Sequence, residues 1–147
     1  MSAENQAIAR RSIEEIWNNR KLEVIDELLA PTFTNHDPNT PDLGTGPEAY
    51  KKLVNLYIAA FPDLRFSIEE LISDEDTVVT RWRSSGTHNG DLGGIAPTNK
   101  KIAVEGVTIN HIKNGKILDQ HVSWDALGMM QQLGVAPAAG EARGRAA

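Results

Sequence analysis

The chain contains four histidines, His36, His88, His111 and His121, and no cysteine, which excludes thiolate chemistry and cysteine-based zinc sites. Two of the histidines and one of the three tryptophans lie in the stretch 100–125, where polar side chains alternate with aliphatic ones. Polar groups along a buried strand cost free energy unless they find partners, so such a strand is typical of a cavity wall. The histidine spacing contains neither HxH nor HExxH, and we expect no metal site.

A β-hairpin must position this stretch. Two β-patterned runs, Lys101–Ile112 and Lys116–Trp124, flank the pair Asn114-Gly115. Asparagine and glycine accept positive φ at little cost, so the pair predicts a tight turn between the two longest strands.

The strand before this hairpin is predicted to run from Thr77 to about His88. Its two arginines share one face, which leaves Trp82 and His88 on the other face, directed inward. The segment 33–38 is bounded by prolines and predicts a brief extended entry to a loop, from which His36 could approach the mouth of a cavity.

Helices are predicted before and after these strands. Apolar spacing and proline or glycine stop signals predict them over residues 2–20, 22–29, 47–60 and 126–133. With a further half-buried strand over 64–73, the order of elements indicates an α+β domain with helices on the concave face of a curved antiparallel sheet. Such a cone encloses a cavity whose mouth is flanked by polar loops.

A chain of 147 residues has the size of one domain, which we expect to span 1–135, and the patternless residues 136–147 predict a disordered tail. The net charge is −5, and lysine and arginine are scattered along the sequence, so the sequence indicates no basic patch for binding nucleic acid. No apolar segment approaches a signal peptide core or the roughly 18–20 residues of a membrane span. We therefore expect a cytoplasmic protein with neither nucleic-acid nor membrane partners.

Several motifs carry a resemblance to a known family: Phe33-Thr-Asn-His-Asp-Pro38, Gly86-Thr-His-Asn-Gly90 leading into Gly94-Ile-Ala-Pro-Thr98, Val104-Glu-Gly106, Asn114-Gly-Lys-Ile117 and Trp124–Gly134. Through them, residues 5–134 resemble the SnoaL-like polyketide cyclase (ester cyclase) family of the nuclear transport factor two-like superfamily. The resemblance implies a cone-shaped, cystatin-like α+β barrel and a polyketide cyclase-like enzyme of lyase or isomerase type.

The resemblance also implies a mechanism. Cyclases of this family close a ring by an intramolecular aldol reaction without metal or cofactor, using an aspartate on the last long strand near a histidine on the preceding strand. A match without gaps puts Thr108 at the position of that histidine and Val122 at that of the aspartate. Valine exchanges no proton and threonine is a poor base near pH 7, so histidine is the expected base.

If Thr108 and Val122 face inward as the resemblance implies, alternation defines a set of substrate-binding residues around an apolar, aromatic pocket. The set is Tyr57, Trp82, Thr108, Asn110, Gln120, Val122 and Trp124, and Leu118 shares its face. We expect His36 or His88 to move a proton there, while the polar members of the set position or polarise a carbonyl or hydroxyl group.

Two functions remain open at this point. The first is a cofactor-free enzyme that acts on a hydrophobic, oxygenated small molecule by cyclisation, isomerisation or hydrolysis. The second is a non-catalytic small-molecule-binding or accessory protein of the same fold, which the replacement of the family's acid by Val122 favours. A carboxylate that orients an inward histidine would favour the enzyme.

The outer face of the sheet predicts a homodimer. Ala103, Val107 and Ile109 share that face and are too apolar to leave in water if the helices cover only the other side. His111 and His121 have the same parity, and we expect them to serve an outer or dimer-facing role.

Overall fold

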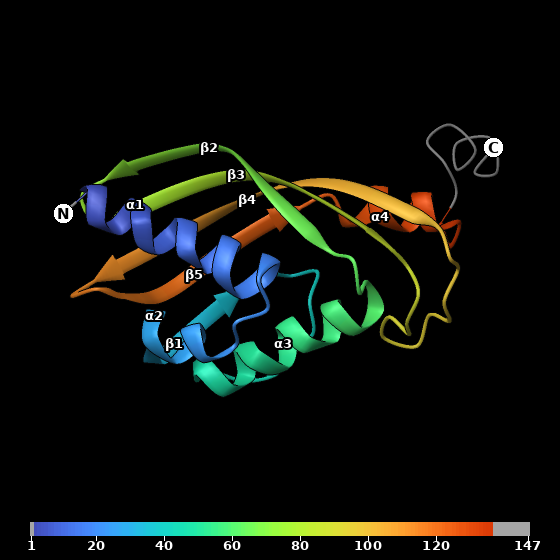
Figure 1. Cartoon of the computed structure of the whole chain (residues 1–147), viewed down its shortest axis with the longest axis horizontal. Coiled ribbons are helices and arrows are strands. Elements are labelled where there is room, and N and C mark those ends of the chain that lie inside the picture. The colour runs from blue at the N-terminus through green and yellow to red at the C-terminus, as the bar shows by residue number, and fades with distance from the viewer. Residues whose placement is uncertain (1, 137–147) are drawn as a thin grey trace.

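The computed structural model describes residues 2–136, in which helices lie against one face of a curved five-stranded sheet (Figure 1). The strands are β1 (Leu29–His36), β2 (Arg65–Asp74), β3 (Thr77–Thr87), β4 (Lys101–Lys113) and β5 (Lys116–Trp124). Their spatial order is β1-β5-β4-β3-β2, and every neighbouring pair is antiparallel except β1 and β5. The predicted α+β class and the curved sheet are confirmed. Of the predicted tail, all but Ala136 lies outside the described residues.

The helices occur where the apolar spacing predicted them. They are α1 (Ser2–Arg11), which continues into the π-helical segment η1 (Ser12–Asn18), α2 (Glu23–Leu28), α3 (Gly46–Ala60) and α4 (Ala126–Leu133). Asp125 caps α4 by accepting a hydrogen bond of 2.9 Å from the backbone N–H of Gly128. Within residues 2–136, no helix has the length and apolar character required to cross a membrane.

Strand β1 corrects the prediction for the segment 33–38. Those residues end a strand that begins at Leu29, whose buried apolar side chains, among them Phe33 at 2 % exposure, anchor it in the core. The strand pairs in parallel with β5, so that His36 lies beside His121. Because β1 ends there and β5 continues to Trp124, the last residues of β5 form a free edge of the sheet.

The hairpin between β4 and β5 contains a β-bulge that the sequence did not predict. The turn is as expected, with φ of 52° at Asn114 and 76° at Gly115. Ile112 pairs with Ile117, but His111 pairs with Asp119, which leaves Leu118 as an extra residue on β5. Leu118 is therefore 38 % exposed, and the prediction that it faces inward is wrong.

Beyond the bulge, the inner face of the hairpin has the predicted parity. Asn110 pairs with Gln120, and Thr108 pairs with Val122. All four side chains point to the same side of the sheet as the helices. There the side chains of Asn110, Gln120 and Thr108 are buried. The bulge thus sets the register that brings the polar residues of β4 and β5 together.

The core lies between the sheet and the helices in two clusters. One includes Val54 of α3, and the other includes Leu133 of α4, which covers one end of the sheet. The aromatic side chains Trp17 and Tyr57 pack against both clusters. Residues of both clusters also line the hollow described below.

Gly106 of β4 is required for the position of Trp82. A Cβ at residue 106 would lie 2.3 Å from Cζ2 of the Trp82 ring, which packs over the paired glycine. We expect Gly106→Ala to lower the free energy of unfolding by about 1–3 kcal/mol, because the ring must leave a closely packed position. Urea denaturation measures this, and Ala103→Ser on the exposed face of the same strand should change it by no more than about 0.5 kcal/mol. Equal stability of the two variants would contradict the packing.

Candidate active site

An inner hollow lies between the concave face of the sheet and the helices, with a volume of about 100 Å³. Its wall is mainly aromatic and aliphatic, with a few polar side chains directed into it. The aromatic residues are Trp17, Tyr50, Tyr57, Phe61, Phe66, Trp82 and Trp124, and the main polar residues are Asn35, Asp37, Thr108, Asn110 and Gln120.

The structure brings together all seven residues predicted to bind substrate. Tyr57, Trp82, Thr108, Asn110, Gln120, Val122 and Trp124 line the inner hollow. Several are fixed by hydrogen bonds: the indole N–H of Trp82 donates to Thr108 Oγ1 at 2.9 Å, and Gln120 Nε2 donates to Asn35 Oδ1 at 2.9 Å. Their placement agrees with the prediction, and their roles remain proposals.

The carboxylate of Asp37 is the acidic group of this hollow, and the sequence analysis missed it. Asp37 directly follows His36, the last residue of β1, which pairs with His121, and it lines the inner hollow together with Val122. The indole N–H of Trp124 donates to Asp37 Oδ2 at 2.9 Å. Among the described residues that line the inner hollow, Asp37 is the only one with a carboxyl group.

Burial raises the pKa of Asp37 above its ordinary value, because a charged carboxylate is poorly solvated among aromatic side chains. Hydrogen bonds from the backbone N–H of Asn39 and from Trp124 stabilise the carboxylate and act in the opposite direction, but burial dominates. Burial also raises the pKa of Tyr50 and of Tyr57. Both phenols are therefore neutral hydrogen-bonding groups at physiological pH.

His36, one of the two predicted proton-transfer residues, points away from the inner hollow. Alternation along β1 directs Asn35 and Asp37 inward and His36 outward, where its ring stacks on that of His121 with centroids 4.4 Å apart. The prediction took the segment as a brief extended entry to a loop and assigned no inward or outward side to its residues. With strand parity applied, buried Phe33 would have identified Asp37 as an inward residue.

His88, the other predicted proton-transfer residue, is completely buried, and it is absent from the wall of the inner hollow. Its Nδ1 accepts a hydrogen bond of 3.2 Å from the backbone N–H of Thr98, and its ring packs against Phe61. The backbone of His88 also bonds to Asn99 and Lys100. These contacts hold the loop after β3 in place, and the geometry gives His88 no direct contact with a ligand in the hollow.

An unpartnered polar atom faces the inner hollow. Within residues 2–136, Thr80 Oγ1, His88 Nε2 and Asn110 Oδ1 are buried side-chain atoms without a hydrogen-bond partner, and of these three residues Asn110 lines the hollow, at 2 % exposure. Buried polar atoms are normally paired, so an unpaired acceptor in a cavity wall indicates a place for a polar atom of a ligand or a water molecule.

A larger outer hollow, of about 700 Å³, adjoins the inner one. It is bounded by the loop over residues 37–46, by α3 and by the outward side chains of β4 and β5 next to the free edge of β5. Asp37, Tyr50 and Val122 belong to the walls of both hollows. The Asp37 carboxyl group therefore stands at the boundary between a wide entrance and a narrow interior.

Sequence comparison matches the chain to a family model and to related proteins. The family model described as SnoaL-like polyketide cyclase matches residues 7–133. The nogalonic acid methyl ester cyclase of Streptomyces nogalater is 31 % identical over 120 residues, which cover 80 % of this chain and 89 % of that protein. The aklanonic acid methyl ester cyclase AcmA of Streptomyces galilaeus is 30 % identical over 134 residues, covering 88 % and 90 %.

Solved structures share the fold. The crystal structure of a protein from Acidithiobacillus ferrooxidans superimposes with a TM-score of 0.81 at 33 % identity, covering 91 % of this chain and 96 % of that one. TsrD from Streptomyces laurentii superimposes with a TM-score of 0.82 at 22 % identity, covering 91 % and 97 %, which shows a likeness of fold alone.

The pKa of Asp37 should lie above its ordinary value of 3.8, and Trp124→Phe should raise it further, because phenylalanine cannot donate a hydrogen bond to the carboxylate. Carbon-13 NMR titration of the aspartate carboxyl groups measures this, with Asp37→Asn to assign the signal. Trp17→Phe is the matched control, since the Trp17 indole donates to Tyr50 and not to Asp37. A pKa that stays the same or falls in Trp124→Phe would contradict the geometry.

The same burial makes stability depend on pH. Because the pKa of Asp37 is higher in the folded chain than in the unfolded one, the folded state loses stability as pH rises from below 3.8 through the raised pKa. The free energy of unfolding of Asp37→Asn should therefore rise relative to that of the wild type across this range. Urea denaturation at a series of pH values would show a constant difference if Asp37 were solvated.

Proposed function

The chain belongs to the SnoaL-like polyketide cyclase family, and we propose on that premise that it is a cyclase-type enzyme whose acid/base group is the Asp37 carboxylate. The observation that carries the proposal is the position of this carboxyl group at the hollow, beside Val122. In the family resemblance the aspartate stands at position 122 of β5. Here the carboxyl group is displaced by one strand, from β5 to the end of β1, and stays on the same face of the sheet.

The environment of Asp37 suits a proton-transfer group. Its raised pKa makes the carboxylate a stronger base than a solvated aspartate, and the hydrogen bond from Trp124 fixes its orientation. These are the features by which a protein adapts a carboxyl group to acid/base chemistry near neutral pH.

In the proposed reaction, the Asp37 carboxylate removes a proton from a carbon atom next to a carbonyl group of the substrate. The resulting enolate carbon attacks a second carbonyl carbon of the same molecule, which forms a C–C bond and leaves the electron pair on that oxygen as an alkoxide. The proton held by Asp37 then passes to the alkoxide and regenerates the carboxylate. The ring closure is thus an isomerisation that needs one group able to take and return a proton.

The amide and hydroxyl groups opposite Asp37 orient the substrate in this proposal. The unpartnered Asn110 Oδ1 can accept a hydrogen bond from a substrate hydroxyl group. Gln120 is held by Asn35, and Thr108 by Trp82, so both side chains are preorganised.

The substrate class that fits is a hydrophobic, oxygenated small molecule of the polyketide type. The relatives are named for methyl esters of nogalonic and aklanonic acid. Such a molecule exceeds the inner hollow of about 100 Å³, whereas the outer hollow of about 700 Å³ lies within the usual range for ligand sites. We place the body of the substrate in the outer hollow and its reacting end at Asp37.

We also propose a homodimer formed through the outer face of the sheet. Ala103 is exposed there, and Val107 and Ile109 are only half-buried in the single chain. Burial of these side chains against a second copy would remove apolar surface from water, and because Val107 and Ile109 also line the outer hollow, the second copy would form part of its wall.

Asp37→Asn should lower kcat by about 10²- to 10⁴-fold while substrate affinity changes little, because the amide keeps the shape and can accept one of the two hydrogen bonds but exchanges no proton. Ring closure of a polyketide methyl ester, followed by absorbance, measures kcat and KM. Asp74→Asn, a change to an exposed aspartate that lines neither hollow, is the matched control and should leave kcat unchanged. Full activity of Asp37→Asn would instead favour another proton-transfer group or a binding function.

The position of the carboxyl group can be tested in the same assay by moving it from residue 37 to residue 122. The double variant Asp37→Asn with Val122→Asp should recover part of the lost kcat, because residues 37 and 122 line the same hollow. A control that places the carboxyl group on the outer face, Asp37→Asn with Ser123→Asp, should recover none. Equal recovery by both double variants would contradict the proposed site.

Val107→Glu should yield monomers, because it places a charge in the middle of the proposed dimer interface. Analytical ultracentrifugation measures the mass. Lys101→Glu, at the exposed start of the same strand, is the control and should remain dimeric. A dimer that persists in Val107→Glu would rule out this face as the interface.

A further inference from the structure

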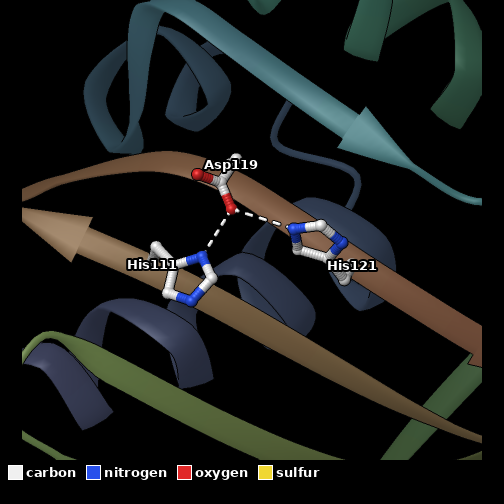
Figure 2. A group of neighbouring side chains, drawn as sticks. All are labelled: His111, Asp119 and His121. Atoms are coloured by element: carbon white, nitrogen blue, oxygen red, sulfur yellow. Dashed lines mark hydrogen bonds and ion pairs between the residues drawn. The ribbon is translucent and has the colours of Figure 1, made fainter.

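A second group of side chains able to bind a ligand lies on the outer face of the sheet, away from the inner hollow. Figure 2 shows Asp119 between His111 and His121, with one carboxylate oxygen directed at both rings. Asp119 Oδ1 is 2.6 Å from His111 Nδ1 and 3.5 Å from His121 Nε2. One ligand atom from each of the three residues lies within 4.8 Å of the other two.

The β-bulge of the hairpin assembles this cluster. In a regular hairpin Leu118 would pair with His111, and the extra residue makes Asp119 its partner instead. His121 follows Asp119 by two residues on the same strand and so points to the same side. His111 contributes the third group from the neighbouring strand. The expectation of no metal site rested on spacing along the chain, which cannot detect ligands that come from two strands.

Two imidazole nitrogens and one carboxylate oxygen are a donor set of borderline softness, which suits Zn²⁺ and similar divalent transition metals better than Mg²⁺ or Ca²⁺. In a tetrahedral zinc site with bonds of ~2.0–2.1 Å, ligand atoms are roughly 3.3 Å apart. The separation of Asp119 from His121 already matches this distance. The shorter contact to His111 needs only a small retreat of that ring, as an ion replaces the shared proton.

His36 supports the arrangement from the adjoining strand. Its ring stacks on that of His121 at an interplanar angle of 11°, and its Nε2 is within 3.1 Å of Thr34 Oγ1. The His36 ring therefore restrains the orientation of His121, and its own Nε2 is engaged with Thr34. The side chains of His111, Asp119 and His121 are 42 %, 29 % and 51 % exposed, so an ion can reach them from solvent. Water can complete the coordination.

We propose that His111, Asp119 and His121 form a binding site for one divalent transition-metal ion of the Zn²⁺ class. All three ligands come from one chain, so the stoichiometry is one ion per chain whatever the oligomeric state. The ion joins β4 to β5 beyond the bulge and stabilises the register of the hairpin. His121 lines the outer hollow together with Asp37, but binding of the ion does not depend on the proposed cyclase function.

Isothermal titration calorimetry of the full chain, free of any histidine tag, with ZnCl₂ at pH 7.5 tests the proposal. We expect saturable binding of one ion per chain, a rise in Tm with zinc that a chelator reverses, and visible absorption bands with Co²⁺ typical of low coordination number. Asp119→Asn and His121→Ala should each weaken binding by about tenfold or more, since loss of a direct ligand exceeds the effect of outer partners.

Glu105→Gln removes an exposed carboxylate from the same face of β4, away from the cluster, and should bind zinc like the wild type. The isosteric Asp119→Asn keeps the test valid even if His121→Ala folds poorly. Absence of saturable binding at millimolar zinc would overturn the proposal. The cluster would then be no more than the hydrogen-bonded pair of His111 and Asp119 with His121 nearby. Binding that persists unchanged in Asp119→Asn would equally overturn the proposal.

Discussion

The pairing of β4 with β5, offset by the one extra residue Leu118, is the constraint on which the rest of the structure depends. It turns Asn110 and Gln120 toward the helices and Asp119 away from them. A slip of one residue would exchange the two faces, because side chains alternate along a strand. The same bulge thus separates the hollow of the proposed acid/base group from the outer cluster that we propose to bind a metal ion.

The Asp37 carboxyl group shows how the fold accommodates a group that is unfavourable for stability. Its burial among aromatic side chains disfavours the charged form, which raises the pKa, and two hydrogen bonds offset only part of that effect. A position of this kind is expected where function, and not stability, has determined the residue. Valine at position 122 leaves the neighbouring strand free of a second carboxylate, whose charge would disfavour ionisation of both.

Much of this could be predicted from the sequence, because long alternating strands and capped helices carry local signals. The inward positions of Thr108 and Val122 followed from the family resemblance and strand parity. The errors have physical causes: β1 is anchored by tertiary burial and by a parallel partner far along the chain, so His36 was misplaced and Asp37 was missed. The bulge at Leu118 has no local signature, and His88 is held by backbone contacts within its own loop and by the distant ring of Phe61.

The most direct test of the central claim is a crystal structure of the protein with a polyketide methyl ester or its ring-closed product bound. The account predicts that the reacting carbon or its carbonyl oxygen lies within hydrogen-bonding or van der Waals distance of an Asp37 carboxylate oxygen, with a ligand oxygen at Asn110. A ligand confined to the outer hollow, with no atom in reach of Asp37, would contradict it.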